Sequence, residues 1–272
     1  MMFSCGRYQL DLSTPKVMGI VNVTPDSFSD GGKYASTNLA VEHALRLVEE
    51  GADILDIGGE STRPNATPVC LEEELNRVIP VIEALAKRTN IPLSIDTYKP
   101  QVMQAAILAG VDMVNDVRAL QEEKALDIVA HSSVGICLMH MQGTPQTMQV
   151  NPYYADVVTE VATFLQARLQ ACVDLGITKN RILLDPGFGF GKRTVDNIAL
   201  LKSLHAVSLG QPLLVGLSRK SVLGAMTGLE VDARLHASIA ASVVAVMKGA
   251  NIVRVHDVKA AVDALKVVAA VF

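Results

Sequence analysis

The chain has 272 residues, with 24 Lys and Arg against 28 Asp and Glu, so its formal net charge is −4, and half of its residues are hydrophobic. Because it has no basic blocks, it lacks the positive field that non-specific binding of nucleic acid needs. Its most apolar stretch, residues 237–247, is shorter than the roughly 18 residues that indicate a membrane span, and residues 1–12 do not resemble a secretion signal. We therefore expect a cytoplasmic protein with neither nucleic acid nor a membrane as partner.

The first predicted unit is a strand followed by a helix. Residues 17–23 (VMGIVNV) are apolar and rich in β-branched side chains, and the turn residues Thr24, Pro25 and Asp26 follow them. A helix is predicted to open at Asn38 and to stop at Gly51, because apolar residues between them recur at helical spacing. The next strand, residues 53–58, follows at once.

The same alternation continues to the end of the chain. Further strands are predicted at residues 93–97, 112–117, 134–140, 181–185, 213–217 and 252–256. Further helices are predicted at residues 71–88, 100–109, 124–132, 154–175, 195–204, 231–248 and 258–269. The eight strands end at intervals of about 33 residues, close to the roughly 250 residues per eight units of a (β/α)8 barrel. We predict an α/β protein, with residues 1–272 forming a single-domain TIM barrel. The rival is a doubly wound open sheet, which would usually carry a glycine-rich nucleotide loop where this chain has residues 22–26.

Polar side chains end most of these apolar strands. They are Asn22, Asp56, Asp96, Asn115, Asp116, His140, Asp185, Ser218, Arg219, Lys220, Arg254 and His256. In a barrel the carboxyl ends of all strands meet at one rim, which is where barrel enzymes hold their active sites. Any single member, such as Asp56 or Asp116, could instead cap a helix or hold a loop.

Positive charge is concentrated after the last two strands. Barrels frequently bind phosphate there, and these loops carry Arg219, Lys220, Arg254 and His256. Arg254 and His256 are two residues apart on a strand, so their side chains should share one face while Val253 and Val255 point the other way. The alternative is a structural ion pair with Asp257.

We expect three of the predicted loops to have a functional role. Residues 185–192 (DPGFGFGK) match neither a Walker loop nor GxGxxG, so we expect their glycines to let the backbone approach a flat ligand, which Asp185 would face. Residues 24–34 and 59–68 are long and rich in turn residues, and we expect both to be lids.

The remaining reactive residue types give weaker indications. Cys5, Cys70, Cys137 and Cys172 form no CxxC pair or zinc cluster, so we interpret them as reduced and mostly packed thiols. The histidines inside predicted helices are interpreted as surface or packing residues; they are His43, His131, His205 and His236.

Seven segments, taken in order, carry a family resemblance. They are residues 18–32 (MGIVNVTPDSFSDGG), 56–64 (DIGGESTRP), 94–97 (SIDT), 115–116 (ND), 185–192 (DPGFGFGK), 216–221 (GLSRKS) and 254–258 (RVHDV). With them the chain resembles the dihydropteroate synthase family of the bacterial folate pathway over nearly its whole length. The resemblance implies a transferase that joins (7,8-dihydropterin-6-yl)methyl diphosphate to 4-aminobenzoate, with release of diphosphate.

The resemblance also implies which residues bind each part of the substrates. Asp185 would accept neighbouring pterin N–H groups, with Asp96, Asn115 and Lys220 around the rest of the ring. The diphosphate would bind Asn22, Thr62, Arg254 and His256, and Asn22 would be the ligand of a Mg²⁺ cofactor. Aminobenzoate, and competing sulfonamides, would meet Ser27, Phe28, Thr62, Arg63, Pro64, Ser218 and Lys220. The residues assigned to catalysis are Asp96, Lys220, Arg254 and His256.

Two other classes remain open on the sequence. A corrinoid-type pterin-binding methyltransferase would share the barrel without needing the diphosphate cations or the lid motifs. A non-catalytic pterin-binding barrel would keep Asp185 and Asn115 but could lose Lys220, Arg254 or His256. The resemblance and the small residues of 237–250 further lead us to expect a homodimer.

Overall fold

The computed structural model describes residues 1–23, 33–63 and 66–271, and its core is a closed barrel of parallel strands. Eight strands pair in the order β10-β3-β4-β5-β6-β7-β8-β9. They are β3 (Lys16–Asn22), β4 (Ile54–Gly58), β5 (Leu93–Asp96), β6 (Met113–Asp116), β7 (Gly135–Met139), β8 (Ile182–Asp185), β9 (Leu213–Val215) and β10 (Ala250–Val255). The predicted (β/α)8 barrel is confirmed, and the open sheet is ruled out.

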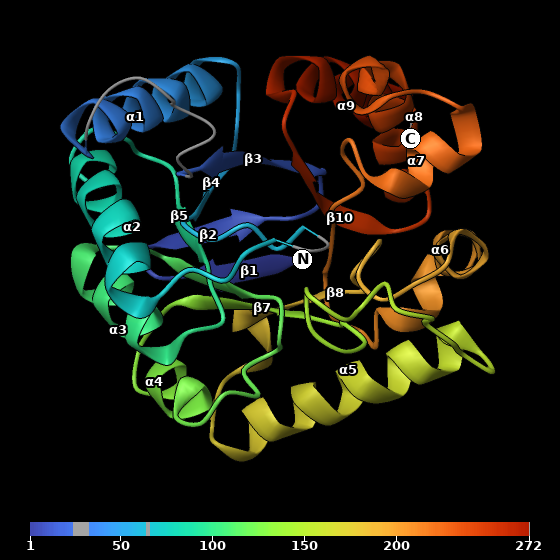
Figure 1. Cartoon of the computed structure of the whole chain (residues 1–272), viewed down its shortest axis with the longest axis horizontal. Coiled ribbons are helices and arrows are strands. Elements are labelled where there is room, and N and C mark those ends of the chain that lie inside the picture. The colour runs from blue at the N-terminus through green and yellow to red at the C-terminus, as the bar shows by residue number, and fades with distance from the viewer. Residues whose placement is uncertain (24–32, 64–65, 272) are drawn as a thin grey trace.

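The helices form a ring around the barrel, roughly in chain order (Figure 1). They are α1 (Lys33–Glu49), α2 (Leu71–Leu85), α3 (Pro100–Ala109), α4 (Ala125–Ala130), α5 (Val157–Asp174), α6 (Thr194–Lys202), α7 (Ser221–Thr227), α8 (Leu235–Met247) and α9 (Val258–Val271). No helix in the described ranges is both long enough and apolar enough to cross a membrane.

The helix boundaries differ most from the prediction at two helix starts. Helix α1 begins at Lys33, five residues before Asn38. The predicted helix over residues 231–248 starts only at Leu235, because residues 231–233 form a separate 3₁₀ turn, and the short helix α7 precedes it. Short helices such as α7 give little periodicity, and the sequence therefore did not reveal it.

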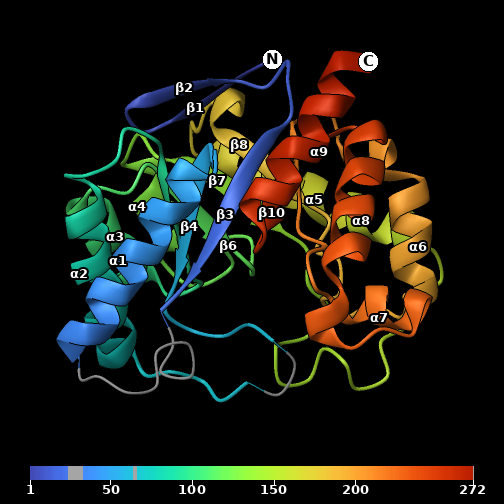
Figure 2. The same ribbon diagram turned by 90° about the horizontal axis from the view of Figure 1, so that it is seen from above.

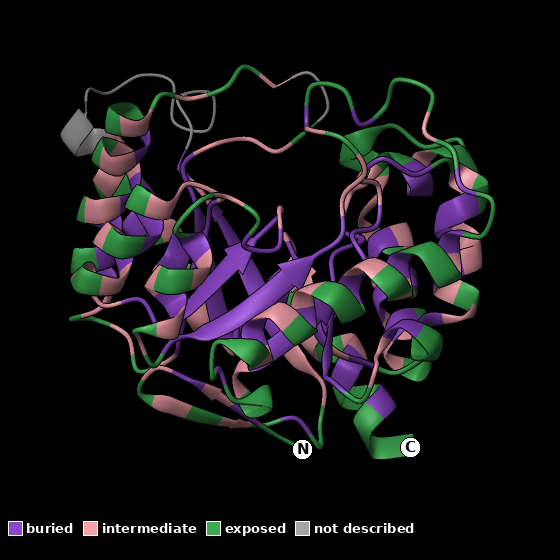
Figure 3. Ribbon diagram, turned by 90° about the horizontal axis from the view of Figure 1, so that it is seen from below, coloured by how far each residue is buried: buried purple, intermediate pink, exposed green. Residues whose placement is uncertain are grey.

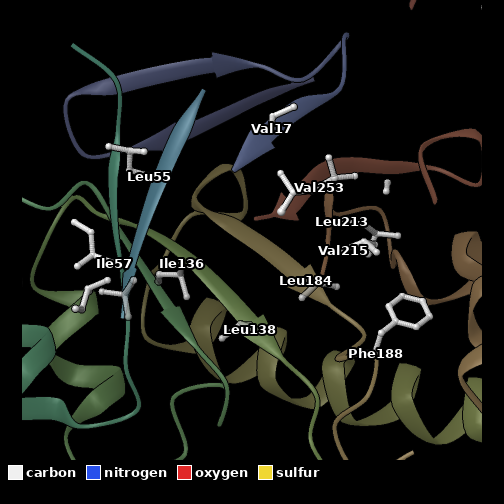
Figure 4. Close-up of a cluster of buried hydrophobic side chains, with 14 of the residues drawn as sticks. Val17, Leu55, Ile57, Ile136, Leu138, Leu184, Phe188, Leu213, Val215 and Val253 are labelled. Atoms are coloured by element: carbon white, nitrogen blue, oxygen red, sulfur yellow. The ribbon is translucent and has the colours of Figure 1, made fainter. Parts of the chain in front are cut away.

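The main hydrophobic layer lies between the strands and the helices. It includes Leu55, Ile57, Leu138, Val215 and Val253 (Figure 4). In Figure 3 the strands are almost entirely buried, while the helices expose their outer faces. Near-continuous burial explains why the strands are apolar runs without alternation of polar residues.

An antiparallel hairpin closes the amino-terminal end of the barrel. Strands β1 (Met2–Cys5) and β2 (Tyr8–Asp11) pair with each other, and they lie at the opposite end from the loops that follow the barrel strands (Figure 2). Phe3, Cys5 and Leu12 of this segment join a buried cluster with inward-facing strand residues, which are Met18, Ile54, Met113, Cys137, Leu183, Leu214 and Ile252. The sequence did not indicate the hairpin, because its two strands are only four residues long.

A glycine allows this close approach of the hairpin. A Cβ atom on Gly135 would lie 2.6 Å from Cζ of Phe3 and 2.7 Å from Cβ of Cys5. The hairpin is also fixed to the barrel by Arg7, whose Nε donates to Asp112 Oδ1 at 2.9 Å. Hairpin and barrel therefore form one packed unit.

The cysteines are free, as the sequence indicated. Cys5, Cys137 and Cys172 are buried, whereas Cys70 is exposed at the start of α2. Burial raises the pKa of Cys5 to about 12 and that of Cys172 to about 11. These two thiols are packing groups rather than nucleophiles.

Candidate active site

Side-chain alternation changes the barrel interior from apolar to polar within two residues. Ile54, Met113, Leu183 and Ile252 belong to the apolar cluster below. Because residues i and i+2 of a strand share a face, the same four strands next present Asp56, Asn115, Asp185 and Arg254. The polar groups thus line the carboxyl end of the barrel, where the sequence placed the active site.

Arg254 is the central cation of this polar layer. Its Nε donates to Asp56 Oδ2 at 2.6 Å, and its Nη2 donates to Asp96 Oδ2 at 2.7 Å. Asn115 Nδ2 donates to the same oxygen of Asp56 at 3.0 Å. Burial disfavours the charged guanidinium, but the two carboxylates outweigh burial and raise the pKa of Arg254. Arg254 is therefore a permanent charge held in a fixed direction.

The two carboxylates each keep one oxygen available. Asp56 Oδ1 and Asp96 Oδ1 are buried and have no hydrogen-bond partner in the described part of the chain. Burial raises the pKa of Asp96 to about 7, against the lowering effect of Arg254 and with further raising by Asp56, Glu74 and Asp116. Buried carboxylate oxygens without partners are costly, so this arrangement suits a ligand that brings N–H donors.

Asp185 and Lys220 face each other across the next part of the rim. Asp185 Oδ1 accepts a hydrogen bond from the Gly187 amide at 2.7 Å, and burial raises the pKa of Asp185 while Lys220 opposes that rise. Lys220 Nζ donates to the Phe188 carbonyl and lies 4.7 Å from the centre of the Phe190 ring. Burial lowers the pKa of Lys220 to about 8.

Phe190 is a site residue that the sequence analysis missed. Its ring flanks the Lys220 ammonium, and Gly189 lies close enough that a Cβ there would be 3.3 Å from Lys220 Cδ. An aromatic face beside a half-buried cation offers a wall for a flat ring. Its position between Gly189 and Gly191 could have marked Phe190 as a site residue, but only the glycines of this loop were interpreted.

His256 follows β10 and is tied to Ser218. The Ser218 Oγ atom accepts from the His256 amide at 3.2 Å and lies 3.0 Å from His256 Nδ1. Burial, together with the charges of Arg254, Arg219 and Arg63, lowers the pKa of His256 to about 4. The imidazole is thus neutral at pH 7, among cations that together form a positive field at this edge.

The predicted phosphate cations divide into two groups. The Asp257 ion pair forms, but with Arg219 in place of Arg254 or His256, and Arg219 Nη2 donates to Asp257 Oδ1 at 2.6 Å. Arg219 adopts a positive φ of 58°, and its amide donates to Ser238 Oγ at 2.9 Å. Its charge is therefore shared with Asp257, whereas Arg254 and Lys220 point into the barrel mouth.

Two rim residues turn out to hold loops. Asp116 accepts from the amides of Arg118 and Leu120 at 2.8 and 2.7 Å, so the loop-holding alternative is correct for this residue. His140 Nδ1 lies 2.9 Å from Lys192 Nζ, and burial lowers the pKa of His140 to about 3. Neither side chain needs a ligand to account for its position.

Two glycines of the glycine-rich loop have a structural role. A Cβ on Gly187 would stand 1.9 Å from the His140 carbonyl oxygen, and one on Gly191 would stand 2.6 Å from that of Gln142. Gly187 and Gly191 are therefore required by contact with the chain's own backbone. Lys192 fixes the loop, because its buried Nζ donates to the carbonyls of Gly187 and Phe190 at 2.8 and 3.1 Å.

The two segments expected to be lids are only partly described. Asn22 ends β3, and Thr62 and Arg63 follow β4, with Arg63 exposed. Ser27, Phe28 and Pro64 lie outside the described residues. The site residues brought together by the fold are Asp96, Asn115, Asp185, Ser218, Lys220, Arg254 and His256, with Asp56 and Phe190 added by the structure.

Comparison with known proteins agrees with this geometry. The family model described as "Pterin binding enzyme" matches residues 18–256. Dihydropteroate synthase of Neisseria meningitidis is 53% identical over 275 residues, covering 98% of this chain and 96% of the relative.

Solved structures show the same likeness. Xanthomonas albilineans dihydropteroate synthase with 4-aminobenzoic acid superposes with a TM-score of 0.94 at 55% identity, covering 99% of this chain and 97% of that one. The Burkholderia cenocepacia enzyme complexed with 7,8-dihydropteroate gives a TM-score of 0.91 at 51% identity, covering 99% and 96%.

The barrel and its polar mouth thus define the class of pterin-binding enzymes. Within that class, the chain belongs to the dihydropteroate synthase family, which are transferases of folate biosynthesis.

Proposed function

We propose that the chain condenses (7,8-dihydropterin-6-yl)methyl diphosphate with 4-aminobenzoate to give 7,8-dihydropteroate and diphosphate. A bond forms between the arylamine nitrogen and the pterin methylene carbon, the carbon–oxygen bond to diphosphate breaks, and the amine loses a proton to solvent. One observation carries the proposal: buried acceptors for a polar ring and fixed cations for a leaving anion occupy the same barrel mouth, joined through Arg254.

The acceptor side of the mouth suits the pterin. Asp185, Asn115 and Asp96 come from three different strands and can surround the polar edge of one flat ring. Asp185 accepts one amide already, so its remaining lone pairs are available for neighbouring N–H groups of a ligand. Lys220 would donate to ring acceptors while Phe190 limits the space beside it.

The cationic side suits the diphosphate. As the carbon–oxygen bond breaks, negative charge grows on the leaving group, and groups that already point at it stabilise the transition state without reorganisation. Arg254 is held for this by its two carboxylates, and neutral His256 can donate from Nε2 when Nδ1 accepts from the Ser218 hydroxyl. Thr62 and Arg63 would complete the anion site.

Magnesium is compatible with the residues at this edge. The described part of the chain has no cluster of three or more His, Cys, Asp or Glu side chains fit for a metal ion. Asn22 nevertheless offers a hard amide oxygen at the end of β3, and Mg²⁺ commonly takes few protein ligands together with waters and phosphate oxygens. When bound there, Mg²⁺ would neutralise charge on the diphosphate.

The aminobenzoate pocket would combine the lids with the last loops. Thr62, Arg63 and Ser218 are the described candidates, and Ser27, Phe28 and Pro64 are proposed from the sequence alone. Lys220 and Phe190 would form the border with the pterin site. The positive field around His256 supports binding of a carboxylate in this region.

We also propose that the protein acts in the cytoplasm as a homodimer. Helix α8 exposes Val244 and Met247, with exposed fractions of 41% and 57%, and has small residues between them and its start. Such a face suits packing against a second copy. Sedimentation of the purified protein tests the dimer, and a monomer at micromolar concentration would contradict it.

The function is tested by measuring diphosphate release from the pterin diphosphate and Mg²⁺, with and without 4-aminobenzoate. Release that depends on aminobenzoate, accompanied by dihydropteroate, is the expected result. A Lys220→Ala variant should bind and convert the pterin substrate poorly. Pterin binding without product from any arylamine would overturn the proposal in favour of a binding barrel, and methyl transfer from a methylated pterin would favour the corrinoid-type alternative.

A further inference from the structure

A buried ionic cluster lies beside the site and takes no part in the chemistry described above. Lys99 Nζ forms ion pairs with Glu60 and with Glu74, and the exposed fractions of the three side chains are 14%, 6% and 1%. Burying three charges is costly unless each is well paired. The cost of burying these charges suggests that the cluster holds a neighbouring part of the chain in place.

Every carboxylate oxygen in this cluster has a donor. Glu74 accepts from Thr97 Oγ1 at 2.7 Å with one oxygen and from Lys99 with the other. Glu60 accepts from the Tyr98 hydroxyl at 3.1 Å and from Lys99. Full pairing means that the cluster is rigid, because no member can move without leaving a buried charge unpaired.

The position of the two glutamates along the chain shows what is held. Glu60 stands immediately before the loop of residues 61–70, and Glu74 stands in the first turn of α2, just after that loop. Arg77 of α2 adds a second link, since its Nη1 donates to the Gly59 carbonyl at 2.7 Å. Both ends of the loop are thus fastened to one point.

That point adjoins the pterin side of the site. Thr97, Tyr98 and Lys99 directly follow Asp96 on the turn from β5 to α3. The charge of Glu74 is also close enough to act on Asp96. The cluster therefore links the loop that carries Thr62 and Arg63 to the carboxylate that would meet the pterin.

We propose that Lys99 is a positioning residue that clamps both ends of the 61–70 loop through Glu60 and Glu74, and so presents Thr62 and Arg63 to the second substrate. The inference rests on the proposed function. Fastening both ends limits the positions that Thr62 and Arg63 can take, so less conformational entropy is lost when aminobenzoate binds to them. The clamp would thus favour aminobenzoate binding more than pterin binding.

The first test uses Lys99→Met, with initial rates measured against each substrate separately. We expect kcat/KM for aminobenzoate to fall about 10²-fold, as for a misplacement of about 1 Å, while KM for the pterin diphosphate changes much less. Lys99→Arg, which can bridge both carboxylates, should recover most of the loss. Equal losses for both substrates, or no recovery by arginine, would overturn the proposal.

A second variant separates positioning from misfolding. Lys99→Met leaves two buried carboxylates unpaired and can unfold the protein, whereas the triple variant Glu60→Gln, Lys99→Met, Glu74→Gln carries no buried charge in the cluster. The triple variant should fold and still show the raised KM for aminobenzoate. Folding with an unchanged KM would show that the clamp does not position the loop.

One further readout does not depend on turnover. Amide hydrogen exchange in residues 61–63 and 66–70 should become faster in the triple variant, while exchange in β8 stays the same. Unchanged exchange would contradict the clamp even if the wild-type protein proved inactive as a synthase.

Discussion

The two ends of the barrel are made from the same strands and are filled in opposite ways. At the amino-terminal end, Ile54 and Ile252 pack against the hairpin, and two residues further along the same strands Asp56 and Arg254 form a buried ion pair. Two residues of strand correspond to about 6.6 Å. Within that distance the interior changes from a layer that stabilises the fold to one that binds charge, so substitutions at the two ends should separate stability from kinetics.

The largest effect is expected at the polar end, for Arg254→Met. The change removes the fixed cation and leaves Asp56 and Asp96 unpaired, so kcat/KM should fall about 10³-fold, and the free energy of unfolding should fall by about 3–5 kcal/mol. Steady-state kinetics and urea unfolding measure the two quantities. Arg7→Met is the matched control, since it removes an arginine–aspartate pair at the other end and should leave kcat/KM unchanged.

Phe3→Ala should give the reverse pattern. Phe3 is fully buried in the hairpin cluster, and its truncation leaves a cavity that should lower the free energy of unfolding by about 3–5 kcal/mol. Because the side chain lies at the end opposite the site, kcat and both KM values at 25 °C should remain those of the wild type. A large change in KM with normal stability would show that the two ends are coupled.

Gly135→Ala tests the fit between hairpin and barrel. The new methyl group would meet Phe3 Cζ at 2.6 Å, and such overpacking should lower the free energy of unfolding by about 1–3 kcal/mol. Combining it with Phe3→Leu should give less destabilisation than the sum of the single changes, because the shorter leucine side chain no longer clashes with the new methyl group. Strict additivity in urea unfolding would contradict this account of the contact.

The smallest effect concerns the pH dependence of the polar end. Burial lowers the pKa of Lys220 to about 8, so the ammonium form is present below that pH and is lost as pH rises through it. Because the pH dependence of kcat/KM follows the pKa values of groups in the free enzyme, kcat/KM should fall about tenfold for each pH unit above 8. Lys220→Arg stays charged, so its lower kcat/KM should show no such fall. A wild-type profile that is flat to pH 10 would contradict the assignment.

The sequence predicted the strands and the rim because both depend on local patterns. Asp96, Asn115 and Asp185 each end a short apolar run, and parallel strands necessarily bring such ends together. The partners of individual side chains were not accessible in this way. Asp56 and Asp116 both lie near the carboxyl ends of mostly apolar strands, yet one faces Arg254 inside the barrel and the other holds a loop.

The features of the site that the sequence did not predict depend on contacts between distant segments. That Asp257 would pair with Arg219 and not Arg254 depends on the left-handed backbone at Arg219 and on Ser238 of α8. The clamp on residues 61–70 likewise depends on Lys99, Glu60 and Glu74 meeting in space, and no spacing in the chain indicates such a meeting.

The hairpin has a consequence for the order in which the molecule is made. Phe3 leaves the ribosome well before its packing partners Leu214 and Ile252. At the usual speed of synthesis, about 12–50 s separate Phe3 from Ile252. For that interval the two short strands lack part of the surface on which they pack, so this segment reaches its final contacts only after the last barrel strand has been made.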